Sequence, residues 1–187
     1  FSDDAVTVLG LYYKLQSFFF IPLNGLQTCI VPILSYNFAC LAYDRCKRIL
    51  YDSCGISLVF MLVGVVSFEC IPGRLIGLFS QDPAVLAIGV PAFRIIGLRF
   101  IPAVLSLMPP VFFQAIGAAG PSLLLSVVRQ ICCLIPLFWI FSKISLEATW
   151  FAYPLSEVIP GSLGVAFYLR QLPRWRREAP MAGPTVR

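Results

Sequence analysis

The fold is decided by residues 15–43, LQSFFFIPLNGLQTCIVPILSYNFACLAY, a run without a charged side chain between Lys14 and Asp44. The apolar core of a bilayer is about 30 Å thick, and a helix needs about 20 mostly apolar residues to cross it. The run is long enough for one crossing, and we expect a membrane span from about residue 15 to residue 36. Pro22 and Pro32 lie inside it and predict a bent helix.

The composition of the whole chain agrees with a lipid environment. Of 187 residues, 59% are hydrophobic and only 12% are charged, and the mean hydropathy is +0.87. Soluble domains average about 25% charged residues, and a domain of this size cannot bury so much apolar surface within itself. Membrane lipid is therefore an expected partner of this chain.

Four more apolar runs follow the first, which predicts an all-α integral membrane protein with about five transmembrane helices. The expected spans are residues 15–36, 49–68, 84–116, 122–141 and 148–169. Together they form one membrane domain over residues 1–170, followed by a basic tail over residues 171–187.

The third run, residues 84–116, is longer than one crossing and contains four prolines, so we expect it to kink, break or project from the membrane. Before it, Ser80 is the expected helix cap and Pro83 is expected in the first turn.

Lysine and arginine are divided unevenly between the two ends of these spans. One end carries seven basic residues: Arg45, Lys47, Arg48, Arg170, Arg174, Arg176 and Arg177. The other carries Arg74 and Lys143, with Lys14 at its edge. Basic residues favour the cytoplasmic side. We therefore expect a multi-pass protein of the plasma (inner) membrane with a cytoplasmic C-terminus.

Several classes of function are disfavoured. The chain has no histidine, the usual general base and commonest metal ligand. The seven cysteines match no zinc-site spacing, and no glycine-rich phosphate loop occurs. The basic residues form no stripe that would indicate nucleic acid. The sequence therefore predicts neither an enzyme nor a bound metal or cofactor.

Ionisable residues inside a membrane usually face the bundle interior or a cavity. Counting residues at 1.5 Å each places Arg129 about 10 Å and Glu157 roughly 18 Å from the cytoplasmic side. Two long side chains on adjacent antiparallel helices could nearly close that gap. We expect them to form a structural ion pair; an ion-coupling role for Glu157 is the alternative. Arg94 is expected to extend toward the outer surface. Gln27, Asn37 and Gln114 are uncharged polar residues that either line a substrate path or form hydrogen bonds between helices. Arg99 is expected to line the same cavity or substrate path.

Five segments resemble the C-terminal half of the multidrug and toxic compound extrusion (MATE) family, in the same order and with similar spacing. They are PILSYNF (32–38), LFSQDP (78–83), FQAIG (113–117), SVVRQICCLIPL (126–137) and WFAYPLSE (150–157). Each segment is short, but together they cover about residues 26–170.

The resemblance implies helices eight to twelve of a twelve-helix transporter, most of one six-helix lobe. It also implies antiport, in which entry of a proton or sodium ion drives export of cationic amphipathic compounds, with an N-terminal lobe of the same transporter as partner. The chain begins at Phe1 rather than methionine, which favours a missing N-terminal part. Residues 84–116 contain no acid, which favours the bacterial DinF/MepA-like branch, whose coupling carboxylate lies in the N-terminal lobe.

Two alternatives remain open. One is a lipid-linked oligosaccharide flippase of the same superfamily, which would use basic residues such as Arg94, Arg99 and Arg129 in its cavity. The other is a non-catalytic structural subunit of a membrane complex.

Overall fold

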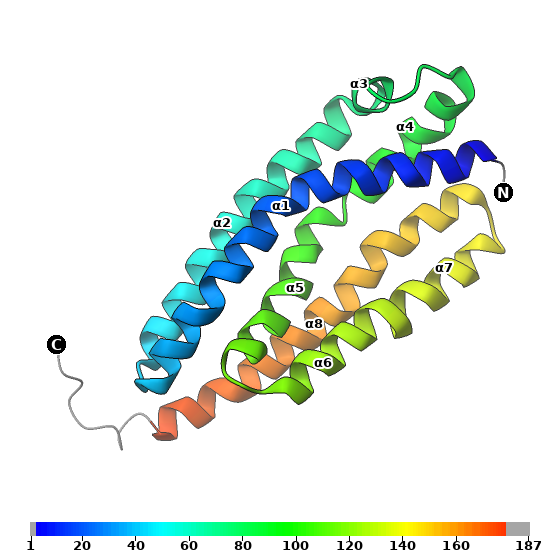
Figure 1. Cartoon of the computed structure of the whole chain (residues 1–187). Helices are drawn as coiled ribbons and strands as arrows, with labels where there is room; N and C mark the ends of the chain where they lie inside the picture. Colours follow the sequence, from blue (N-terminus) through cyan, green and yellow to red (C-terminus); the bar gives the residue numbers. More distant parts are fainter. Residues whose placement is uncertain (1–2, 179–187) are drawn as a thin grey trace.

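The computed structural model describes residues 3–178, with side chains as far as Pro173. Within that part every regular element is a helix (Figure 1). In chain order they are α1 (Asp3–Ala39), α2 (Tyr43–Cys70), α3 (Pro72–Gly77), α4 (Pro83–Gly97), α5 (Phe100–Ala115), α6 (Ala119–Val127), the π-helical turn η1 (Val128–Leu134), α7 (Ile135–Ser142) and α8 (Leu146–Glu178).

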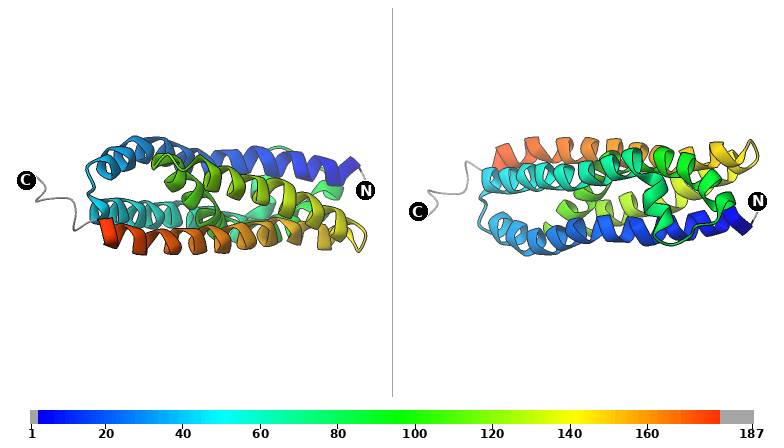
Figure 2. Two further views of the ribbon diagram at one scale, coloured as in Figure 1. Left: turned by 90° about the horizontal axis from the view of Figure 1, so that it is seen from below. Right: turned by 90° about the horizontal axis from the view of Figure 1, so that it is seen from above.

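The long helices run back and forth along one axis (Figures 1 and 2). The connection between α1 and α2 lies at the same end as the C-terminal end of α8, and the start of α1 and the α7–α8 connection lie at the other. Arg45, Lys47 and Arg48 are in the first turns of α2 rather than in a loop. They and Arg170 are therefore at one end of the bundle.

The expectation of an all-α membrane protein is confirmed. In the described part, three helical stretches are long and apolar enough to cross a bilayer: α1, α2 and the continuous stretch Ala119–Ser142. The pair α4 and α5 qualifies as a fourth, bent span. Although α8 is long enough, it does not meet the same test of apolarity. It contains the expected fifth span, residues 148–169, and packs along α5 and α7.

Two helices extend beyond the expected boundaries. At the N-terminal side, α1 already begins at Asp3, twelve residues before the expected start of the first span. At the other end, α8 continues to Glu178, so the first part of the expected basic tail is helical. The rest of that tail, residues 179–187, lies outside the described residues.

The third run is broken, as expected. α4 and α5 meet at an angle of 48° across Leu98 and Arg99. Pro102 explains the position of the break: it has no N–H to donate to the carbonyl of Leu98, and its ring would clash with that carbonyl in a regular helix. The break turns Arg99 into the bundle interior, where 5% of the residue is exposed.

Local sequence fixes both ends of this broken span. The cap of α4 is Asp82, whose side chain accepts a hydrogen bond from the backbone N–H of Ala84 at 2.8 Å. The expectation that Ser80 is the cap is therefore wrong, whereas Pro83 does begin the helix. After α5 the chain turns at Gly117, which has a φ of 74°. Such a positive φ favours glycine over residues with a Cβ.

Small residues allow α8 to approach α5 closely. A Cβ added to Gly164 would lie 2.8 Å from the Cβ and Cγ of Pro109, and one added to Gly161 would lie 3.4 Å from the backbone of Leu105. Helices in lipid associate largely through such close packing, because burial of apolar surface gives little driving force there. The glycines therefore determine how closely α8, which carries Glu157, approaches α5.

Candidate functional site

A buried cluster of charged side chains lies where the broken span meets α8. Its centre is Glu157, of which 1% is exposed. An Nη2 atom of Arg99 donates to Glu157 Oε1 at 2.8 Å. Nε of Arg129 lies 3.5 Å from Glu157 Oε2. Ser106 on α5 also donates a hydrogen bond to Oε2. The carboxylate of Glu157 thus interacts with two guanidinium groups and accepts a hydrogen bond from one hydroxyl.

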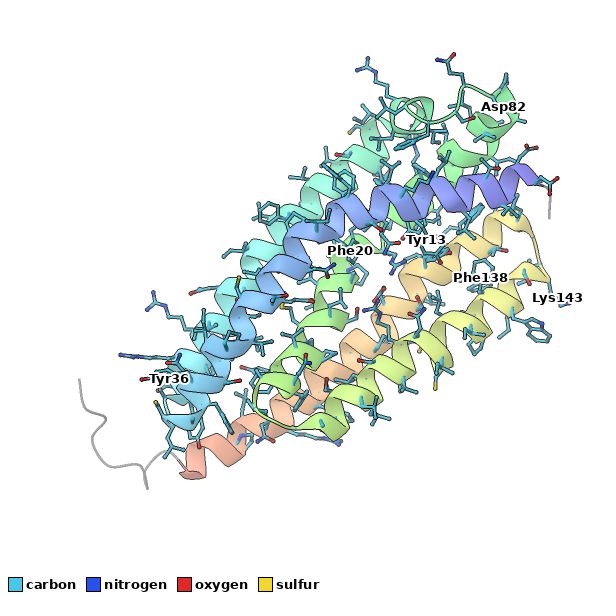
Figure 3. The ribbon with its side chains drawn as sticks, in the orientation of Figure 1. Tyr13, Phe20, Tyr36, Asp82, Phe138 and Lys143 are labelled. Atoms are coloured by element: carbon cyan, nitrogen blue, oxygen red, sulfur yellow. The ribbon has the colours of Figure 1, made fainter. Side chains whose placement is uncertain are left out.

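Arg99 also joins the cluster to α1. Its Nη1 donates to the hydroxyl of Tyr12 at 2.8 Å, and its guanidinium carbon lies 5.4 Å from the ring centre of Tyr153 and 6.0 Å from that of Phe20. Tyr13 and Tyr153 share a hydroxyl–hydroxyl contact of 3.3 Å. Figure 3 shows Tyr13 and Phe20 on the side of α1 toward α5 and α8. A cation between aromatic faces is further stabilised by their quadrupoles.

Arg129 is brought in by a local irregularity of the helix between Ala119 and Ser142. It lies in η1, where the helix widens to π geometry. Pro136 lies two residues after the end of η1, and in a regular α-helix its ring would clash with the carbonyl of Cys132. We infer that the wider turn relieves this clash and turns Arg129 toward α8. Turns of this kind are frequent at functional sites.

The cluster holds together four parts of the bundle: α1, α5, η1 and α8. A charge at the centre of a bilayer costs about 2.5–3.5 kcal/mol on insertion scales, so each member depends on the others. The two guanidinium groups and single carboxylate leave one positive charge in excess. Chemically, the arrangement is suited to fixing helices in place and to presenting a cationic wall. Among the described residues, no group of histidine, cysteine or acidic side chains could hold a metal ion.

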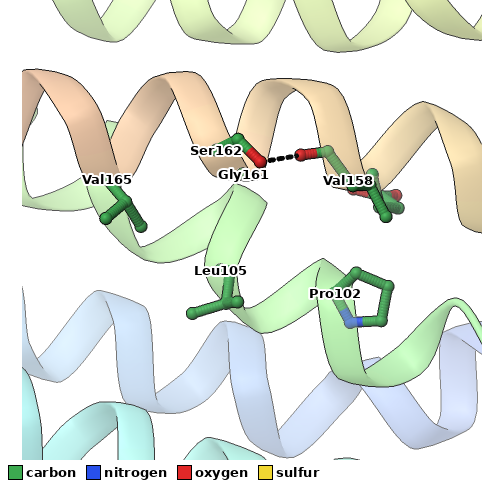
Figure 4. A pocket seen from close by; sticks show the side chains of 7 residues that line it. Pro102, Leu105, Val158, Gly161, Ser162 and Val165 are labelled. Atoms are coloured by element: carbon green, nitrogen blue, oxygen red, sulfur yellow. Dashed lines mark hydrogen bonds between the residues drawn. The ribbon is translucent and has the colours of Figure 1, made fainter.

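Two cavities flank the cluster. One, of about 440 Å³, lies between α5 and the stretch formed by α6 and η1, and Arg129, Gln114 and Ser106 are among the residues that line it. The other, of about 370 Å³, lies between α5 and α8 and is mostly apolar (Figure 4). Glu157 forms part of its wall, although its side chain is almost completely covered.

The family follows from comparison of the sequence with known families. The model of the MatE family matches residues 1–140. The chain belongs to this family. Its members are transporters, and the five MATE-like segments in the sequence therefore indicated the family correctly.

Solved MATE structures match this chain in fold. A multidrug resistance MATE transporter of the MOP superfamily in its outward-facing conformation gives a TM-score of 0.87 over 94% of this chain at 14% identity. The inward-facing conformation of such a transporter gives 0.85 over 92%, also at 14% identity. A MOP superfamily transporter from Pyrococcus furiosus, described as having a binding pocket of reverse polarity, gives 0.86 over 93% at 14% identity.

Each of these matches covers 40% of the solved chain. The present chain therefore spans about 40% of the length of the transporters it resembles, which agrees with most of one lobe. A comparison with curated protein sequences gives no match.

The polar residues expected along a substrate path are dispersed in this MATE chain. Gln114 is exposed and lines the cavity beside Arg129. Gln27 is half-buried, and its Nε2 has no hydrogen-bond partner among the described residues. Asn37 donates to the carbonyl of Ile33 in its own helix at 2.8 Å. Arg94 is exposed near the end of α4.

Arg99 has a partner that the sequence did not predict. It is the closest basic partner of Glu157, whereas Arg129, the expected partner, is the more distant one. Tyr12 and Ser106, which complete the cluster, were not singled out from the sequence. A tyrosine and a serine among apolar residues carry no pattern that marks them, because their role depends on the bend between α4 and α5.

Proposed function

We propose that the complete transporter, this chain together with a second lobe, exports cationic amphipathic compounds across the plasma membrane. Entry of a proton or sodium ion would drive the export. The observation that carries this proposal is the family match over residues 1–140. It is supported by the likeness in fold to transporters described as conferring multidrug resistance.

In this proposal the chain is the C-terminal lobe, and an N-terminal lobe of the same transporter is its partner. Alternating access in such folds rocks one bundle against another around a site between them. The coupling acid is proposed to lie in the other lobe. The broken span α4–α5 has no acidic residue, and the carboxylate of Glu157 is already engaged by Arg99 and Arg129.

The test is transport by the complete protein in sealed vesicles. A fluorescent organic cation should move against its concentration gradient when a proton or sodium gradient is imposed, and should stop when an ionophore collapses that gradient. Vesicles without protein are the control. Transport that continues at the same rate without any ion gradient would contradict the mechanism.

A second candidate is a lipid-linked oligosaccharide flippase of the same superfamily. One observation favours it: Arg99 and Arg129 outnumber the single carboxylate between them. The Pyrococcus furiosus transporter with a pocket of reverse polarity shares the fold. A cargo with a pyrophosphate would need such a cationic wall. The same vesicles distinguish the two functions, because the flippase would move an anionic lipid-linked cargo and leave the fluorescent cation untouched.

Thiol labelling tests the proposed orientation. Cys46 is fully buried and cannot report on it, but Cys40, between α1 and α2, and Cys70, at the far end of α2, are both exposed. With each as the single cysteine, an impermeant reagent should label Cys70 in intact cells and Cys40 only after permeabilisation. The reverse pattern would place the C-terminus outside the cell.

A further inference from the structure

The cavity between α5 and the α6–η1 stretch contains several polar groups and no acidic residue. Its polar wall consists of Arg129, Gln130, Gln114 and the three serines Ser106, Ser122 and Ser126, and its apolar wall of Leu107, Pro110 and Val111. A volume of about 440 Å³ lies in the range of small-molecule sites. Apolar walls with a few convergent polar groups are typical of such sites.

The guanidinium of Arg129 is the charged group of this cavity. Its side chain is 22% exposed, against 6% for Arg99. Its Nε faces Glu157, and within the described part of the chain its two Nη atoms donate no hydrogen bond. Since Arg99 is already paired with Glu157 at 2.8 Å, the positive charge in excess is the one that faces the cavity.

Two amides lie beside this guanidinium. Gln114 comes from the last turn of α5 and Gln130 from η1, and both are exposed. Each side-chain amide can donate two hydrogen bonds. The serines are less available, since Ser122 and Ser126 donate to backbone carbonyls at 2.9 and 3.0 Å. A guanidinium and two amides together suit an oxygen anion, because arginine binds carboxylate and phosphate with two parallel hydrogen bonds.

From this arrangement we propose that the cavity binds the anionic head group, a carboxylate or phosphate, of an amphiphilic molecule. The head group would accept hydrogen bonds from Arg129, Gln114 and Gln130, and its apolar part would pack on Leu107 and Val111. An organic cation is the wrong ligand here, because no acidic residue lines the cavity and the carboxylate of Glu157 is buried and already contacts Arg129 and Ser106. The site is independent of the direction and energy source of transport.

Binding of octyl phosphate tests the proposal directly. The complete transporter is placed in phosphatidylcholine nanodiscs and titrated with octyl phosphate in a calorimeter, with octyltrimethylammonium as the probe of opposite charge. Arg129→Gln should weaken octyl phosphate binding about 10-fold or more, as expected for a charged hydrogen bond. Gln114→Leu should weaken octyl phosphate binding about 3-fold. Because this change leaves both ion pairs intact, it tests the site even if Arg129→Gln lowers the yield of folded protein. Arg94→Gln removes an equal charge from an exposed position of α4 and should change binding less than about 2-fold.

A second arm distinguishes a soluble ligand from a lipid. Nanodiscs with one-fifth phosphatidylglycerol are analysed for the lipid that remains with the purified protein. Retention of phosphatidylglycerol that depends on Arg129 and Gln114, without binding of octyl phosphate, would support the site with a lipid as its ligand. The proposal is wrong if neither anion depends on these two residues, or if octyltrimethylammonium binds more tightly than octyl phosphate. Neither readout requires an ion gradient, so failure here and failure of the transport proposal are separate results.

Discussion

Glu157→Gln is expected to lower the stability of this lobe more than any other single substitution in the buried cluster. The change leaves the guanidinium groups of Arg99 and Arg129 without a carboxylate, and removing one partner of a buried ion pair costs about 3–5 kcal/mol. For a chain of this size that corresponds to a fall in melting temperature of about 6–20 °C. Thermal unfolding in detergent and the yield of monodisperse protein measure the effect.

The cluster also predicts an order among the single variants. Arg99→Gln should cost less than Glu157→Gln because Arg129 still neutralises the carboxylate, and Arg129→Gln should cost least because that contact is longer and more exposed. Glu147→Gln is the matched control: it lies on the same helix but is exposed, and it should change stability by no more than about 0.5 kcal/mol. Equal losses for Glu147→Gln and Glu157→Gln would contradict a structural cluster.

Gly164→Ala is expected to lower stability by overpacking the contact between α8 and α5. The added Cβ would meet the Cβ and Cγ of Pro109 at 2.8 Å, and a proline ring cannot rotate away. Overpacking of this kind costs about 1–3 kcal/mol, and alanine in a helix interior gains about 1 kcal/mol over glycine, so we expect a net loss of up to about 2 kcal/mol. The melting temperature should fall, and α5, which carries Pro109, should shift away from α8.

Gly55→Ala provides the control for this change. It lies inside α2, and a Cβ there would meet no atom within 4 Å. The stability of the Gly55→Ala variant should stay the same or rise slightly, since only the helix propensity at this position changes. If both alanine variants behave alike, the close approach of α8 to α5 at Gly164 is not what limits the packing.

The fold could be predicted largely from the distribution of charge along the sequence. Residues 15–43 fit a membrane-spanning helix because lipid disfavours charged side chains, and a helix pairs its own backbone groups. The boundaries were harder to predict. A helix continues for as long as its backbone bonds are satisfied, so α1 begins at Asp3, well before its apolar run. The end of a charge-free run therefore does not mark the end of a helix.

The site could be predicted only in part. Counting residues along two antiparallel helices placed Arg129 and Glu157 at depths that differ by about 8 Å, close enough for long side chains to meet. In the structure Nε of Arg129 lies 3.5 Å from Oε2 of Glu157. The nearer partner, Arg99, depends on the 48° bend between α4 and α5. A run with four prolines predicts a break, but not which residue it turns inward. The π-helical turn that holds Arg129 left no recognisable pattern either, because it depends on how one proline is accommodated.

The double variant Arg99→Gln/Glu157→Gln tests most directly whether the buried pair holds the lobe together. Glu157→Gln leaves the guanidinium groups of both Arg99 and Arg129 without a carboxylate, whereas the double change also removes Arg99 and leaves only Arg129 without one. We therefore predict that the double variant is more stable than Glu157→Gln by at least about 1 kcal/mol, within the usual range of interaction energies in double-mutant cycles. Losses that simply add, so that the double variant is the least stable of the three, would contradict the account.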